Sequence, residues 1–179
     1  MNSDEQANAD DRQVSGSARV DAASLSLRQI DRSGALSILE RRCPPGRLWA
    51  PGYPTTGDLE SARLFIRRLG EGEAPGPFGI FEIVKGAADE VVGGIGFHRP
   101  PSADGAVEVG YGIVPALWNQ GICTEALQAI VAFAREHGAR GVEARSLPGN
   151  AASRRVMEKV GLRFVDVVDG YTRYELRFS

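Results

Sequence analysis

The sequence predicts a mixed α/β domain in which helices cover a sheet of about seven strands. Three strand-like runs, separated by turn-rich segments, follow one another between residues 78 and 114. Two helix-like segments precede this block, and two more are interleaved with the strands after it. This order differs from the regular strand–helix alternation of a parallel sheet and indicates a mixed one.

The size and charge of the chain set the first limits on its function. It has 179 residues, the size of one compact domain, and a net charge of −2 from 21 basic and 23 acidic residues. This balance gives no general attraction to nucleic acid or to an anionic membrane. No apolar run is long enough to cross a bilayer, and the first 20 residues lack the apolar centre of a signal peptide. Two cysteines, Cys43 and Cys123, suggest no disulfide framework, so we expect a reduced, cytoplasmic setting.

The N-terminal part is expected to contain a tail, one strand and one helix. Residues 1–23 are polar and acidic, which predicts a disordered tail before a domain spanning 24–179. "SLSLRQI" (24–30) alternates as a strand does, and "RSGALSILERR" (32–42) has helical spacing. Pro44 and Pro45 then end the helix.

A loop, a second helix and the block of strands follow. Residues 45–57 form a proline- and glycine-rich loop with two aromatic residues. "DLESARLFIRRLG" predicts a helix with Asp58 as its N-cap and Gly70 at its end. The three strands are expected at 78–84, 90–98 and 106–114, where turn-rich segments separate them.

The C-terminal part is expected to contain two helices and three strands. One helix begins after Gly121, and a short strand occupies "GVEARSL" (141–147). Asn150 is the expected N-cap of the next helix, "AASRRVMEKVG", with Ser153 at its third position. The last segment, "FVDVVDGYTRYELRF", predicts a hairpin around Asp169-Gly170.

The stretch "WNQGICTEAL" (118–127) is the first candidate binding site. The first turn of a helix leaves backbone N–H groups unpaired, and these groups with the helix dipole suit a phosphate. Gly121 allows close approach of a ligand, Asn119 tolerates left-handed dihedrals, and Thr124 adds a hydroxyl. A simple strand-to-helix turn explains the same residues equally well, so local physics leaves both interpretations open.

Two longer stretches carry a resemblance to a known family. "VEVGYGIVPALWNQGICTEAL" followed by "NAASRRVMEKVGLRFV" resembles the GNAT superfamily of N-acetyltransferases, in particular the branch of ribosomal-protein N-terminal acetyltransferases. The resemblance covers roughly residues 25–178 and implies the GNAT fold, with a mostly antiparallel sheet flanked by four helices. It also implies acetyl-CoA as cofactor, with its pyrophosphate held by the turn before the helix. In this chain that turn consists of Trp118, Asn119, Gln120, Gly121, Ile122, Cys123 and Thr124. Trp118 and Cys123 depart from the arginine or glutamine and the small residue that are usual there.

Glu108 and Ser153 are the candidate catalytic residues. Alternation in "VEVGYGIV" places Glu108 on one face with Gly110 and Gly112, and it places Tyr111 on the opposite, core-facing side unless a bulge near Gly110 redirects it. Glu108 matches the family's usual base, and we expect burial to raise its pKa. A strand glutamate paired with an arginine, or one that binds a substrate ammonium, remains an alternative.

The resemblance also assigns roles to residues around the acetyl donor. Ser153 matches a hydroxyl that can protonate the departing thiolate of CoA, and Asn150 and Ser153 match contacts to pantetheine. Ile113 matches the residue whose backbone pairs with pantetheine. For Asn150, the role of helix cap is a complete explanation by itself.

The acceptor site is the least defined by sequence. The resemblance places it between the loop of the first two helices and the final hairpin, where the chain offers Trp49, Tyr53, Asp58, Tyr171 and Arg173. The aromatic loop is explained equally well as an apolar plug over the core. His98, at the end of a strand, is a further candidate for substrate contact. His98 and His137 have no ligand spacing, so no metal is expected, and no histidine beside Cys123 supports a nucleophilic thiol.

These observations predict an acetyl-CoA-dependent N-acetyltransferase that acts on a primary amine, either a protein N-terminus or a small molecule, in a ternary complex. A non-catalytic acyl-CoA-binding regulator with the same fold is the alternative. A nucleic-acid-binding module is a distant third, because the chain is acidic overall. A homodimer is left open as the assembly state.

Overall fold

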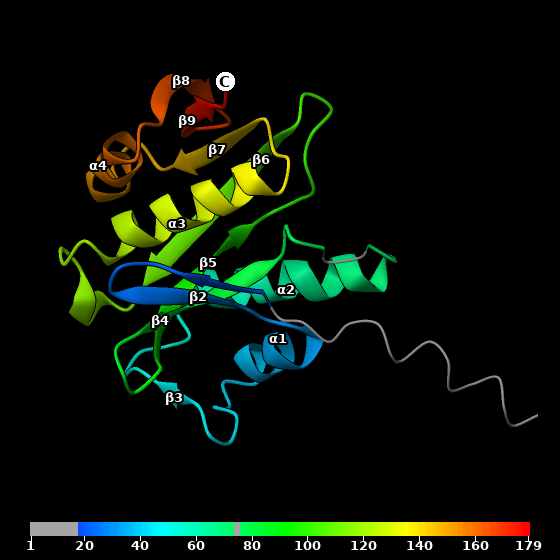
Figure 1. The fold of residues 1–179 in the computed structure, drawn as a ribbon, viewed down its shortest axis with the longest axis vertical. Coiled ribbons are helices and arrows are strands. Elements are labelled where there is room, and N and C mark those ends of the chain that lie inside the picture. The colour runs from blue at the N-terminus through cyan, green and yellow to red at the C-terminus, as the bar shows by residue number, and fades with distance from the viewer. Residues whose placement is uncertain (1–17, 74–75) are drawn as a thin grey trace, which may run out of the picture.

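Within residues 18–73 and 76–179, which the computed structural model describes, the chain forms nine strands and four α-helices around one sheet (Figure 1). In chain order the elements are β1 (Arg19–Asp21), β2 (Leu25–Gln29), α1 (Arg32–Leu39), β3 (Leu48–Trp49), α2 (Thr56–Gly70), β4 (Ile80–Lys85), β5 (Glu90–Phe97), β6 (Ala106–Ile113), the 3-10 turn η1 (Pro115–Leu117), α3 (Ile122–Glu136), β7 (Gly141–Ser146), α4 (Ala151–Lys159), β8 (Arg163–Val168) and β9 (Tyr171–Arg177).

The sheet has the order β1-β2-β4-β5-β6-β7-β9-β8, and β3 pairs with β5. Its neighbours are antiparallel except for β6–β7 and β3–β5, which are parallel. The predicted mixed, mostly antiparallel sheet with four helices is therefore confirmed. The two strands beyond the expected seven are β1 and β3, which are too short to show an alternating pattern.

The start of the sheet differs from the expected domain boundary. Residues 1–17 of the expected tail lie outside the described residues. Residues 19–21, which belong to the same expected tail, form β1 and pair with residues 26–28 of β2. The sheet thus begins before residue 24, because β1 is held by its pairing with β2 and by the packing of Val20 against the core.

The helices cover the two faces of the sheet. Helix α3 crosses one face and packs on β2, β5, β6 and β7, with α4 beside it (Figure 1). Helices α1 and α2 pack against each other, and α2 packs on β4, β5 and β6. The apolar stripe of α3, including Leu127, Ile130 and Ala134, is fully buried, which is expected for an amphipathic helix laid on a sheet.

Local signals placed most element ends correctly, with one correction at α2. Asn150 caps α4 by accepting a hydrogen bond from the Ser153 N–H at 3.0 Å, as predicted. At α2 the N-cap is Thr55, and the expected cap, Asp58, is the third helical residue of a capping box. The Asp58 carboxylate reaches back to the N–H and the hydroxyl of Thr55, both at 2.7 Å.

The bulge that the sequence left open near Gly110 is absent from the described structure, where β5 and β6 pair without interruption over residues 93–97 and 109–113. The irregularity lies in β5 instead, since Gly93 pairs with Ile83 but Val91 pairs with Val84, leaving Val92 as the extra residue. Alternation along β6 therefore holds, and it controls which side chains face the site.

Candidate active site

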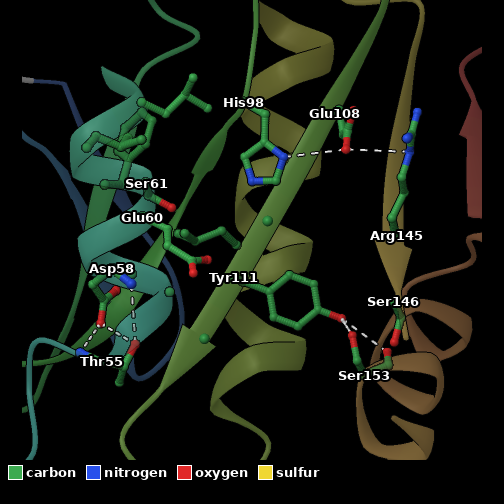
Figure 2. Close-up of a pocket in the computed structure, with 18 of the residues that line it drawn as sticks. Thr55, Asp58, Glu60, Ser61, His98, Glu108, Tyr111, Arg145, Ser146 and Ser153 are labelled. Atoms are coloured by element: carbon green, nitrogen blue, oxygen red, sulfur yellow. Dashed lines mark hydrogen bonds and ion pairs between the residues drawn. The ribbon is translucent and has the colours of Figure 1, made fainter. Parts of the chain in front are cut away.

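The candidate site is a cavity of about 620 Å³ at the point where β6 and β7 separate (Figure 2). The two parallel strands pair only over residues 106–109 and 141–144, although β6 runs on to Ile113 and β7 to Ser146. Helix α2 lines the cavity from one side of β6, and the start of α4 lines it from the other. This opening between two strands reaches both faces of the sheet.

Glu108 lies in this cavity within a cluster of cationic side chains. Its carboxylate accepts a hydrogen bond from Arg99 Nη2 at 2.7 Å and lies 3.4 Å from His98 Nδ1 and 3.6 Å from Arg145 Nε. Only 14% of the Glu108 side chain is exposed. The predicted face of Glu108 is confirmed.

The expected direction of the Glu108 pKa shift is wrong. The hydrogen bond with His98 lowers the pKa of Glu108, and the charges of Arg145, His98 and Arg99 act in the same direction against burial. Glu108 is thus held as a carboxylate, which makes it a weaker proton acceptor than an isolated buried glutamate. The alternative of a strand glutamate paired with arginines describes its surroundings better.

His98 is the titratable side chain that Glu108 orients. Its Nδ1 atom faces the carboxylate, and its ring lies over Gly110 of β6 (Figure 2). A Cβ atom on residue 110 would lie 2.4 Å from His98 Nε2, so only glycine leaves room for this ring. The imidazole lines the cavity as a substrate-contacting residue would. A carboxylate on one ring nitrogen fixes the ring and leaves the other nitrogen for chemistry.

Tyr111 packs against the core, as expected, and it also lines the cavity. Its side chain leaves the α3 side of β6, as alternation predicts, but β7 has already diverged there and the ring lines the cavity. The hydroxyl lies 3.0 Å from Ser153 Oγ and donates to the Ser153 carbonyl at 3.1 Å (Figure 2). Burial raises the pKa of Tyr111 to about 12. Ser153 is therefore paired with a neutral phenol, a contact that the sequence did not indicate.

The turn before α3 has the geometry of an anion cradle. Asn119 and Gly121 both have positive φ values, 62° and 82°, and no side chain of the described residues caps the helix. The amides of Ile122, Cys123 and Thr124 in the first turn are therefore free to bind an anion, which fits the pyrophosphate of CoA. None of the described residues 118–124 lines the cavity itself, so the turn and the cavity are separate parts of the site.

The two residues that depart from the family pattern make specific contacts in this turn. Trp118 is 61% exposed and donates its indole N–H to the carbonyl of Ile113 at 3.2 Å, the residue expected to pair with pantetheine. Burial raises the pKa of Cys123 to about 11, which makes a thiolate nucleophile unfavourable, as expected. Beside them, Gln120 accepts a hydrogen bond from Lys85 at 3.3 Å, which brings a cation to the turn.

The structure divides the expected acceptor residues into two groups. Tyr53, Asp58, His98 and Tyr171 line the cavity. Trp49 does not. It packs edge to face on Tyr53 with ring centroids 5.0 Å apart, so it supports the site from behind.

Arg173 also lies outside the cavity, where Asp166 binds it through two hydrogen bonds of 2.8 and 2.9 Å. The positive charge of Arg173 is therefore used in an ion pair within the β8–β9 hairpin, which is a structural role.

Sequence reasoning missed Arg99, Arg145 and Glu60 as lining residues. Alternation in "GVEARSL" puts Arg145 opposite the buried Val142 and Ala144, a weak signal that it shares a face with Glu108. Arg99 lies in a proline-rich turn, where no periodicity applies.

Two classes of site find no support in residues 18–73 and 76–179. No group of three histidine, cysteine or acidic side chains is arranged to hold a metal ion. Among the helices of the same residues, none combines the length and apolar character that crossing a bilayer requires.

Comparison with known proteins agrees with the geometry. Residues 24–163 match the model of the acetyltransferase (GNAT) domain. The uncharacterised N-acetyltransferase YjdG of Bacillus subtilis is 31% identical over 118 residues, which cover 62% of this chain and 70% of YjdG.

Solved structures show the same fold at lower identity. The ribosomal-protein-S5-alanine acetyltransferase of Vibrio fischeri is 14% identical with a TM-score of 0.61, over 89% of this chain and 96% of its own. Mycobacterium smegmatis RimJ, solved in complex with CoA-disulfide, is 19% identical with a TM-score of 0.57, over 90% of this chain and 86% of its own. The matched domain, the uncapped turn before α3 and the opening between β6 and β7 lead to one conclusion: the chain belongs to the GNAT acetyltransferase family of acetyl-CoA-dependent enzymes.

Proposed function

We propose that this protein acetylates a primary amine, of a small molecule or of a protein N-terminus, by direct attack of the amine while acetyl-CoA is bound. The observation that carries the proposal is the His98–Glu108 pair in the cavity where β6 and β7 separate. An amine attacks only in its neutral form and must lose a proton during transfer, so a base in this cavity is what the reaction needs.

His98 is the base in this scheme, and Glu108 is a positioning residue. Nε2 of His98 accepts the proton that the attacking nitrogen loses, while Nδ1 faces the Glu108 carboxylate. The ionised carboxylate orients the ring and stabilises the imidazolium that forms. Glu108 was expected to be the base; its lowered pKa agrees better with the role of a positioning residue.

Ser153 is the proton donor for the leaving sulfur. Its Oγ lies at the opening between the strands, where Tyr111 Oη, 3.0 Å away, orients it. Acetyl-CoA supplies the acetyl group as a thioester, and its departing thiolate needs one proton. Ser153 gives that proton and regains one from solvent, and His98 releases the proton of the amine to solvent, so both residues are restored and the proton count is balanced.

Residues of the turn and of α4 hold the cofactor in this proposal. The first-turn amides of α3 bind the pyrophosphate, and Lys85 and Gln120 add polar groups beside them. Asn150 and Ser153, at the start of α4, line the cavity where pantetheine would pass. The Ile113 carbonyl already accepts a hydrogen bond from Trp118, and its second lone pair is the one that pantetheine would use.

One substitution tests whether the space that Gly110 leaves for the His98 ring matters for the reaction. Gly110→Ala would place a Cβ 2.4 Å from His98 Nε2 and displace the ring from Glu108. We expect kcat to fall by about tenfold to a hundredfold, the cost typical of a misplaced catalytic group. The melting temperature of Gly110→Ala separates this loss of turnover from a loss of stability of the strand. Wild-type kcat in Gly110→Ala would show that the ring position is unimportant.

Thermal melting with and without acetyl-CoA tests the proposed function directly. Ligand at 100 times its Kd stabilises the folded state by about 2.7 kcal/mol, so Tm should rise clearly. Thiol release with a panel of amines then measures transfer. A shift without release on any amine or N-terminal peptide supports the regulator alternative, and no shift at millimolar acetyl-CoA contradicts the proposal.

A further inference from the structure

The half of the cavity that α2 lines contains polar atoms with no partner among the described residues. Asp58 is 7% exposed, and both hydrogen bonds to its carboxylate go to Oδ2. Its other oxygen, Oδ1, lies against Gly94 of β5, where a Cβ would approach it to 2.4 Å. The capping box therefore fixes the carboxylate and aims the unpaired oxygen into the cavity.

Tyr53 contributes a second unpaired group beside Asp58. The residue is 8% exposed and lines the cavity, and its hydroxyl has no hydrogen-bond partner within residues 18–73 and 76–179. Neither atom is among the fully buried polar atoms without a partner, so water that enters the cavity can reach both of them. Two such groups on the wall of one cavity suit a ligand that replaces this water and donates hydrogen bonds to both.

The charges of the cavity are separated. Glu108 is balanced by Arg99 and Arg145 on the side of β6 and β7. On the α2 side, Asp58 and the exposed Glu60 form no ion pair with any described residue. A positive charge on the substrate amine would therefore be stabilised next to α2 and not next to Arg99 and Arg145.

We propose that Asp58, Tyr53 and Glu60 form a subsite for a second positive charge on the acceptor, so that the substrate is a small amine carrying another protonated amino group. This inference rests on the proposed function of the same cavity. One nitrogen is neutral and reacts beside His98. The other remains an ammonium, donates to Asp58 Oδ1 and the Tyr53 hydroxyl, and lies close to the Glu60 carboxylate. Small size is favoured because the 620 Å³ cavity must also admit the acetyl-bearing end of the cofactor.

The titration of Asp58 agrees with such a role. Burial raises the pKa of Asp58, although the hydrogen bonds from Thr55 oppose this. The folded state then holds the proton more tightly than the unfolded state, so stability falls as pH rises from 3.8 through the higher folded-state pKa. Burial thus disfavours the charged form of this carboxyl, and Asp58→Asn, which keeps an oxygen that can accept from Thr55, should leave Tm unchanged or higher.

A pair of acceptors with the same carbon chain tests the subsite. Putrescine carries two amino groups and n-butylamine carries one. For the wild type, kcat/KM for putrescine should exceed that for n-butylamine by about tenfold or more, as one charge-assisted contact provides. Asp58→Asn should abolish most of this preference by raising KM for putrescine, with kcat at saturation and KM for acetyl-CoA unchanged.

Two further variants complete the experiment. Glu60→Gln should reduce the preference less, because Glu60 is exposed, and it also serves if Asp58→Asn fails to fold. Glu136→Gln, at the exposed end of α3, removes the same charge outside the cavity and should keep the wild-type preference. A wild-type preference near one, or an equal loss for both amines in Asp58→Asn, overturns the subsite.

Binding separates this inference from the reaction itself. If neither amine is acetylated, titration of CoA-loaded protein with putrescine and with n-butylamine still measures the affinity of the subsite for each amine. Tighter binding of putrescine that Asp58→Asn removes supports the subsite and places the failure in the proposed reaction. Equal binding of the two amines overturns the subsite, whatever the reaction.

Discussion

His98→Gln is expected to lower kcat by about two orders of magnitude while the affinity for acetyl-CoA stays unchanged. General base catalysis contributes typically 10²–10⁴-fold, and a glutamine amide keeps polar contacts but accepts no proton at neutral pH. Since His98 lines the cavity but lies apart from the turn at 118–124, the loss should appear in turnover and not in cofactor binding. Steady-state thiol release at saturating acetyl-CoA measures kcat, and the melting shift measures binding.

Two other variants make this result specific. Glu108→Gln removes the charge that orients His98 and leaves Arg99 and Arg145 without their partner, so it should lower kcat less than His98→Gln does. His137→Gln is the matched control, because His137 bonds the Phe133 carbonyl at 2.8 Å on α3, outside the cavity. A larger loss in Glu108→Gln than in His98→Gln would make Glu108 itself the base and return the scheme to the usual family arrangement.

Gly121→Val should weaken acetyl-CoA binding by about a hundredfold. Residue 121 has φ of 82°, a left-handed conformation that costs an L-residue roughly 1–2 kcal/mol and a β-branched residue more. The valine side chain would also stand where the phosphates approach the first-turn amides of α3. The backbone strain lowers the stability of the folded state, whereas the steric block weakens binding; a hundredfold rise in Kd corresponds to about 2.7 kcal/mol. Isothermal titration with acetyl-CoA gives the affinity.

Gly138→Val provides the matched control for Gly121→Val. Gly138 has φ of 86°, follows the other end of α3 and, like Gly121, has no atom within 4 Å of an added Cβ. Both variants therefore carry the same backbone strain, and both should melt below the wild type. Only Gly121→Val should lose acetyl-CoA affinity. If both variants bind equally well, the turn at 118–124 is not the pyrophosphate cradle.

Local patterns were sufficient for most of the elements. The strand at 106–113, the helix after Gly121, the cap at Asn150 and the turn at Asp169-Gly170 each depend on residues close in sequence, and the structure confirms each of them. Residues 118–124 belong to this group, because a helix N-terminus exposes its amides regardless of the rest of the fold.

The chemistry of the cavity could not be predicted in the same way. Glu108 was placed on the correct face, but the direction of its pKa shift depends on Arg99, Arg145 and His98, which come from other segments. Arg145 reaches Glu108 only through the register of β7 beside β6, and Tyr111 meets Ser153 only because these strands diverge. Likewise, the sequence does not show that one oxygen of Asp58 is left for a ligand. This follows only from the contacts of Asp58 with Thr55 and with Gly94.

By itself, the sequence determined the fold class, the order of the elements, the family and the turn suited to the cofactor, because these depend on short-range periodicity and on backbone conformation. The tertiary structure alone decided which titratable groups become neighbours. It shows that cationic neighbours lower the pKa of Glu108 and that the Asp58 carboxylate has no ion-pair partner among the described residues, and it makes His98 the candidate base. The physical reason is that a pKa is set by burial and by charges within a few ångströms, whose partners here come from segments far apart in the chain.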